Sequence, residues 1–264
     1  MTDLPLAGPA ARGFASRAGS VALLLFALAP AMVCAAAEER PPSAAIEALK
    51  SDFEAIGDQS RADPVAQIDA FEVGPPAADE AGRMHQVMRR FMNSLLVIRN
   101  GYLAELDAMG WNAILDADRL RADTDLADSR RLIEQARAVG LRAQAASENA
   151  FHGFEGLVQE APLRPETKRG MIIGFNQNKA RGLAEMRGTF ALESETLDQF
   201  EAMVELLGRT DWDVEDSQIM FHQDADVDAF NARFHRIQAL NSQLEARQQA
   251  NVKRAQDRLS NPGL

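Results

Sequence analysis

Long stripes of apolar residues that recur every three or four positions dominate this chain of 264 residues. Such spacing buries one face of an α-helix. Glycine or proline separates one stripe from the next, and the four long stripes cover residues 79–109, 124–162, 165–208 and 224 onward. Alanine, leucine, glutamate and arginine are abundant, which also favours helix. The sequence therefore predicts an all-α fold, a bundle of long antiparallel helices.

One segment near residues 211–221 departs from this spacing. Its large apolar residues alternate with polar ones on both sides of a polar turn, a pattern typical of a β-hairpin. Two strands are not stable alone in water, so the hairpin is expected to lie against the helices. Trp212 and Phe221 are the expected buried anchors, with Glu215 to Gln218 exposed in the turn.

The first 37 residues have the order of a secretory signal. Arg12 and Arg17 precede the uncharged run of residues 21–29, Pro30 ends this run, and the alanines at 35–37 offer a cleavage site. We therefore predict a signal peptide over residues 1–37 and a periplasmic location for the remainder.

Two other interpretations of this N-terminal segment remain open. Its uncharged stretch has about the ~20 residues of a membrane helix, so the segment could stay uncleaved as an anchor. Membrane contact is expected only through this segment, and only if it is not cleaved. Cys34 also allows a lipoprotein, although Ala31 and Val33 fit a lipobox poorly.

Pro75-Pro76 marks the predicted boundary that follows the signal peptide. Short helices are expected over residues 38–75, one from Ser43 to Gly57 and a second from Pro64 to Gly74. The helical bundle domain is expected over residues 76–264.

Composition excludes several classes of function. The net charge of −11 repels phosphate backbones, so no nucleic acid is expected as a partner. Cys34 is the only cysteine, and cleavage after residue 37 would remove it. The mature chain would then have no disulfide, no thiol chemistry and no covalently attached c-type haem.

Motifs that carry chemistry are missing from the sequence. There is no phosphate-binding glycine loop, no nucleophile elbow and no paired zinc motif. The four histidines are scattered, so a serine nucleophile would have no base beside it. We therefore expect no enzyme, no catalytic residue and no cofactor.

Asp224, Asp226 and Asp228 imitate the start of a calcium loop. Position six of such a loop is glycine and position twelve is glutamate, but this chain has Ala229 and His235 there. The three aspartates fit better as negative charge at the N-terminus of a helix.

Glu148, His152 and Glu155 are spaced so that they share one helical face, as in a metal site within a bundle. A two-metal bundle needs matching Glu-x-x-His pairs on other helices, and this chain has none. We interpret the cluster as ordinary helix surface and expect no metal site.

Residues 214–240 resemble a segment in a family of exported, mostly helical enterobacterial proteins, some of which are lipoproteins. The similarity rests on the pair Ile219-x-Phe221 ahead of a helix that carries Phe230-Asn231. It implies an exported helical domain and carries over no activity.

The sequence favours a non-enzymatic binding or scaffolding protein of the cell envelope. Its expected partner is another envelope protein, met through helix faces or the hairpin end. The alternative is a small-ligand carrier or sensor with a pocket between helices. A pocket with convergent polar groups would favour the ligand, and a contiguous exposed apolar patch would favour the protein partner.

Overall fold

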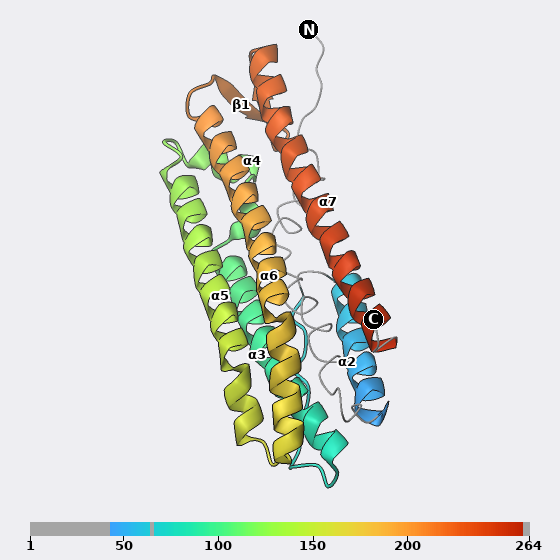
Figure 1. Ribbon diagram of the computed structural model, residues 1–264. Coiled ribbons are helices and arrows are strands. Elements are labelled where there is room, and N and C mark those ends of the chain that lie inside the picture. Colours follow the sequence, from blue (N-terminus) through green and yellow to red (C-terminus); the bar gives the residue numbers. More distant parts are fainter. Residues whose placement is uncertain (1–42, 64–65, 261–264) are drawn as a thin grey trace. The chain divides into compact units, whose positions relative to one another are not determined.

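The computed structural model describes residues 43–63 and 66–260 (Figure 1). The regular elements are α2 (Ser43–Ala62), α3 (Glu80–Ala108), a short 3₁₀ turn (Trp111–Ala113), α4 (Ala117–Ala122), α5 (Ala127–Glu160), α6 (Pro165–Leu207), β1 (Trp212–Glu215), β2 (Gln218–Phe221) and α7 (Asp224–Ser260). The fold is all-α with one hairpin, as predicted. The predicted signal peptide, with Cys34, lies outside the described residues.

Contacts along the chain divide it into two compact units. The first unit comprises Tyr102–Arg142 and Phe190–Leu244. Among the described residues, the second unit comprises residues 43–101, Ala143–Thr189 and residues 245–260. The helices α3, α5, α6 and α7 each contribute residues to both units.

Local signals explain where the long helices begin and end. Pro165 opens α6, where its missing N–H costs nothing. Gly110 follows α3 with a φ of 79°, a left-handed conformation that glycine adopts easily. The Asp123 carboxylate accepts hydrogen bonds from the backbone N–H groups of Asp128 and Ser129 and so caps the start of α5.

Within the first unit, α6 and α7 run antiparallel. Gln199 of α6 meets Arg233 of α7, whereas the earlier Glu195 meets the later Arg236. Both pairs are exposed, so they orient the helices more than they stabilise them. The apolar stripes supply the stability, with Ile237 and Leu240 of α7 fully buried.

Four phenylalanine rings pack together in the core of the second unit. Phe91 of α3 meets Phe151 and Phe154 of α5 and Phe175 of α6 edge-on, with ring centroids 5.8, 5.2 and 5.6 Å away. The rings of Phe154 and Phe175 stack at 4.0 Å. Phe91 therefore connects three helices through a single side chain.

The buried Asp52 side chain fastens α2 to α3. Its carboxylate accepts two hydrogen bonds from Arg89, at 2.8 and 2.7 Å, and lies 2.6 Å from Nε2 of His85. Burial alone would raise the pKa of Asp52, but the hydrogen bonds from Arg89 and His85 outweigh it and hold the pKa below its usual value. Asp52 is therefore charged and fully paired.

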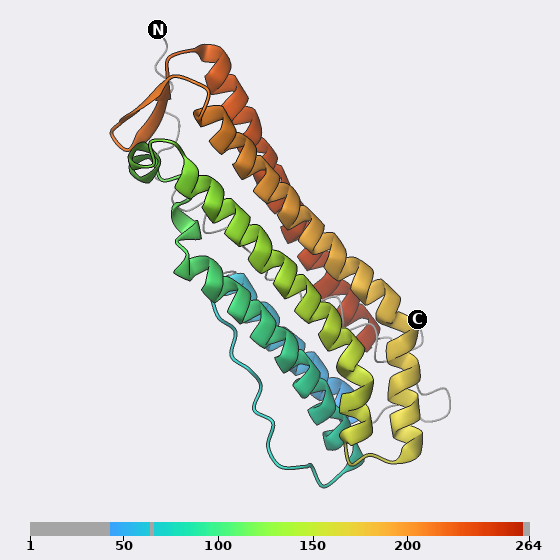
Figure 2. The same cartoon turned by 90° about the vertical axis from the view of Figure 1, so that its left-hand side faces the viewer.

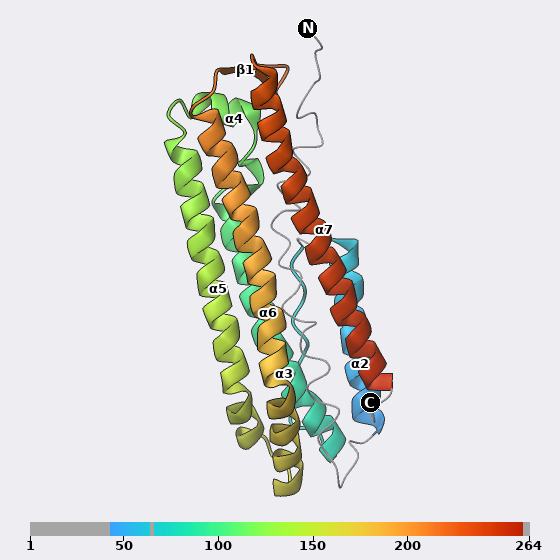
Figure 3. The same cartoon turned by 45° about the horizontal axis from the view of Figure 1, so that its top comes forward.

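The predicted hairpin is present and belongs to the first unit. Trp212 pairs with Phe221 and Val214 with Ile219 in an antiparallel ladder, and β1 contacts α4 (Figure 3). Asp216 and Ser217 form the two-residue turn with φ angles of 49° and 60°. Positive φ at both positions matches the right-handed twist of paired strands.

The buried anchors of the hairpin differ from the predicted ones. Val214 and Ile219 are buried, Ile219 to 1% exposure, while Trp212 and Phe221 are only half-buried. All four lie on the same face of the ladder, so the predicted face is correct. Trp212 donates its indole N–H to the Leu207 carbonyl, and Phe221 packs against Phe230.

Truncating Ile219 should therefore destabilise the protein more than truncating Phe221. We expect Ile219→Ala to cost about 2–4 kcal/mol, as for a buried aliphatic residue. Phe221→Ala should cost about 1–2 kcal/mol, because its side chain is only partly buried. Urea unfolding followed by circular dichroism measures both. A larger loss for Phe221→Ala would contradict the observed burial.

The second short helix, predicted from Pro64 to Gly74, does not form. The first continues through Gly57 as the single helix α2, and the described residues 66–79 contain no helix. Residues 66–77, which we call the strap, instead run extended beside α3 (Figure 2).

Side chains of α3 hold the strap by its backbone. Asn93 accepts from the N–H of Phe71 and donates to its carbonyl, both at 2.8 Å. Asn100 does the same for Ile68, at 3.2 and 2.8 Å. Gln86 binds the end of the strap across several residues. It accepts from the N–H of Ala77 and donates to the carbonyls of Gly74 and Pro75. These bonds replace those of a helix.

Candidate functional site

Of the three residues Glu148, His152 and Glu155 on α5, Glu148 forms an ion pair. Arg187 of α6 donates two hydrogen bonds to Glu148, at 2.8 and 2.9 Å. These bonds lower the pKa of Glu148 to about 2. His152 and Glu155 are exposed on the same helix. A carboxylate paired in this way is not available as a ligand.

The three aspartates at residues 224–228 begin helix α7. Asp224 and Asp226 lie in its first turn, where negative charge faces the positive end of the helix dipole. Throughout the described ranges, residues 43–63 and 66–260, no group of three or more His, Cys, Asp or Glu side chains could hold a metal ion.

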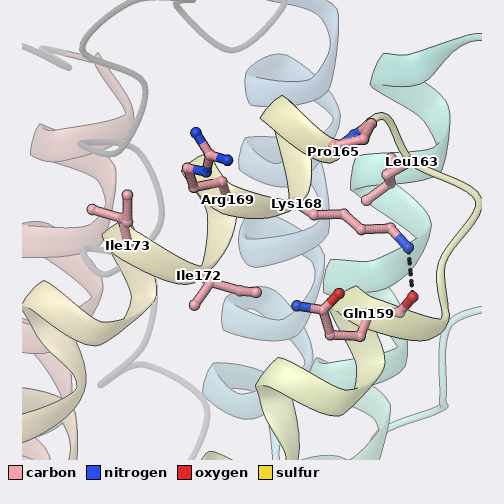
Figure 4. Close-up of a pocket in the computed structure, with 7 residues that line it drawn as sticks. All are labelled: Gln159, Leu163, Pro165, Lys168, Arg169, Ile172 and Ile173. Atoms are coloured by element: carbon pink, nitrogen blue, oxygen red, sulfur yellow. Dashed lines mark hydrogen bonds between the residues drawn. The ribbon is translucent and has the colours of Figure 1, made fainter.

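A pocket of about 470 Å³ lies where α5 turns into α6, in the second unit. This volume is within the range of small-ligand sites, ~300–1,000 Å³. Figure 4 shows the residues that line it, which are Gln159, Leu163, Pro165, Lys168, Arg169, Ile172 and Ile173.

A tight connection between two helices creates this pocket. Helix α5 ends at Glu160, and Pro165 starts α6 after four residues. Lys168 reaches back from α6 and donates to the Gln159 carbonyl at 2.5 Å (Figure 4). A cation is favourable there because the last carbonyls of a helix carry partial negative charge.

The lining combines an apolar wall with positive charge. Four of its seven residues are apolar, and Ile173 is 47% exposed. Lys168 and Arg169 are its two charged residues, both cations, in a chain of net charge −11. Arg169 is exposed and takes part in no ion pair among the described residues. The pocket therefore suits a ligand with an apolar body and a negative end.

A second unusual group is the buried Glu193 of α6, in the first unit. Burial raises its pKa to about 8, and the approaching Tyr102 hydroxyl lowers it only in part. Neither carboxyl oxygen has a partner with proper hydrogen-bond geometry. Burial, together with the Glu193 carboxyl, also raises the pKa of Tyr102. Glu193 is therefore protonated at neutral pH.

Sequence reasoning missed Glu193, although a signal was present. Phe190, Leu197, Phe200 and Val204 form the apolar stripe of α6, and a residue at 193 completes the spacing of three and four. A glutamate in that position is either exposed by a local distortion or buried. The structure shows it buried.

The chain was compared with protein-family models, with curated proteins and with solved structures, and none of them matches it. The resemblance of residues 214–240 to exported helical proteins therefore stays a prediction. Among the described residues, no helix carries an apolar stretch long enough to span a bilayer.

Proposed function

We propose that this chain is an exported, non-enzymatic binding protein of the cell envelope, and that it binds a small amphiphile with an anionic head. The observation that carries the proposal is the pocket between α5 and α6, with its apolar wall and two cations. Convergent polar groups beside apolar surface are typical of ligand sites.

The two ends of the ligand have separate roles. An alkyl chain against Leu163, Ile172 and Ile173 removes apolar surface from water. A carboxylate or phosphate at the opening lies near Arg169, which can bind it through two parallel hydrogen bonds. Lys168 already donates one hydrogen bond to the end of α5, so it contributes its charge and its remaining N–H donors.

Calorimetry with decanoate below its micelle concentration tests this function. Decanoate is expected to bind, and decanol, which has the same chain without the charge, is expected to bind more weakly. Ile173→Asp should abolish binding, because it places a negative charge on the apolar wall. Its 47% exposure makes the substitution tolerable for the fold. Arg169→Gln should weaken binding about threefold to tenfold, since the side chain is exposed.

Lys253→Gln is the matched control, because this exposed lysine on α7 is not part of the pocket. It should leave decanoate binding unchanged. Equal binding by the wild type and Ile173→Asp would reject the pocket as the site. Binding to anionic vesicles without binding to monomeric decanoate would reject the small-ligand function in favour of a membrane surface.

A further inference from the structure

The strap and α3 match each other in period. The α3 amides recur every seven residues and we call them the amide row: Gln86, Asn93 and Asn100. Asn100 and Asn93 bind strap residues that are three apart, Ile68 and Phe71. Gln86 binds the end of the strap, most closely through the Pro75 carbonyl at 2.7 Å. Seven helical residues rise about 10.5 Å, and three extended residues span about 10 Å. A helix with amides at this spacing therefore stays in register with any extended chain.

The amide row contacts main chain rather than side chain. Asn93 and Asn100 each bind both the N–H and the carbonyl of one strap residue. An amide can do this because it carries a donor and an acceptor side by side. Such contacts are available to any residue except proline, so the surface recognises an extended conformation first.

Arginine side chains add contacts and some selectivity to this surface. Three arginines of α3 donate to strap carbonyls: Arg83, Arg89 and Arg99. Arg83 and Arg89 are also paired with carboxylates outside the strap, those of Glu80 and Asp52. Arg89 lies over the Phe71 ring, 5.3 Å from its centroid. The surface therefore favours an aromatic residue at the position of Phe71.

The strap buries few side chains for its length and is held mostly through its backbone by hydrogen bonds from α3. Ile68 is its one buried side chain. Within residues 67–78, all of them described, no hydrogen bond joins two backbone groups. Segments with few buried contacts open locally at low free energy, and connections this long without secondary structure are uncommon unless they have a function.

We propose that the amide row of α3 is a recognition surface for an extended segment of a partner protein with an aromatic residue at the position of Phe71. The strap is its resident occupant, which the partner segment displaces. The partner segment has an apolar residue at every third position, as Ile68 and Phe71 are placed in the strap. This surface is separate from the pocket between α5 and α6, so either proposal can fail without the other.

A labelled peptide with the sequence of residues 66–77 tests the surface through fluorescence anisotropy. The full-length wild type should bind it weakly, because the tethered strap competes at a high effective concentration. The Ile68→Ser variant loses the strap's buried anchor and should bind the peptide at least tenfold more tightly. Phe71→Ser, at a half-buried position, should act in the same direction and serves if Ile68→Ser fails to fold.

Two controls isolate the amide row. A peptide N-methylated at the positions of Ile68 and Phe71 lacks the two donated N–H groups and should bind about tenfold less tightly or worse. Adding Asn93→Ala and Asn100→Ala to the Ile68→Ser variant should cause a similar loss. Gln177→Ala, an exposed amide on α6, should cause none.

Three results would overturn the proposal. The first is no peptide binding by an Ile68→Ser or Phe71→Ser protein that circular dichroism shows to be folded. The second is equal binding of the N-methylated and unmodified peptides. The third is conversion of the variants to dimers in light scattering, which would assign the surface to the strap of a second copy.

Discussion

The protein is expected to melt about 10 °C lower at pH 8.5 than at pH 5.5, and Glu193→Gln is expected to remove most of this difference. The folded state keeps Glu193 protonated up to a pKa of about 8, whereas the usual value is 4.5. Between these values the unfolded chain releases a proton that the folded protein retains. Stability therefore falls as pH rises through this window.

The size of the effect follows from proton linkage. The contribution of Glu193 is fully present below pH 4.5 and is lost as pH rises towards 8. A shift from 4.5 to about 8 corresponds to roughly 5 kcal/mol, of which about 3 kcal/mol is lost between pH 5.5 and pH 8.5. At about 2–4 °C per kcal/mol for a chain of this size, the melting temperature moves by about 10 °C.

Thermal unfolding followed by circular dichroism at half-unit pH steps measures this slope. Glu205→Gln is the matched control, because this glutamate is exposed on the same helix, and its slope should equal that of the wild type. Tyr102→Phe should extend the fall in stability to higher pH, since the hydroxyl that partly lowers the Glu193 pKa is gone. An unchanged slope in Glu193→Gln would show that the buried carboxyl does not control the pH response.

Phe91→Ala is the second substitution with a large expected effect, a loss of about 3–5 kcal/mol in the free energy of unfolding. Phe91 is fully buried and meets three other rings within 5.8 Å. Truncation removes the apolar surface, leaves a cavity and breaks edge-to-face pairs that stabilise beyond their area.

Urea unfolding gives the loss directly. Val97→Ala on the same helix is the control, since Val97 is 65% exposed and should change stability by less than about 0.5 kcal/mol. A loss below about 1 kcal/mol for Phe91→Ala would mean that the surrounding rings close the cavity, and that the four-ring core does not determine stability.

The long helices could be predicted from the sequence because their boundaries depend on local signals. The stripe predicted over residues 165–208 is α6, Pro165–Leu207, and the stripe predicted over residues 79–109 is α3, Glu80–Ala108. Proline at a first turn and glycine after a last one act through backbone geometry alone. Such signals do not depend on the rest of the fold.

The strap could not be predicted, because its conformation depends on residues elsewhere in the chain. Pro64 and Gly74 stand at the two ends of this segment, as at the ends of a short helix, and the apolar residues Ile68 and Phe71 fit helical spacing. Asn93 and Asn100 decide the outcome by binding the backbone of those two residues. The sequence of the segment itself does not predict this contact with α3.

The candidate pocket could not be predicted from the sequence either. Its residues are near one another in the chain, but its volume depends on how α5 and α6 meet and on where Lys168 reaches.

The hairpin could be predicted in part from the sequence. Alternation predicted its buried face correctly, whereas the depth of Ile219 relative to Phe221 depends on packing against the helices.

The hairpin also bears on how the protein behaves in concentrated solution. An open strand edge is a template for pairing with another chain, and from there for aggregation. Here each strand is only four residues long, and β1 carries the exposed charges Asp213 and Glu215. The Arg121 guanidinium also donates to the Val214 carbonyl at 3.4 Å. Short, charged and partly covered strands of this kind leave little edge for a second molecule to extend.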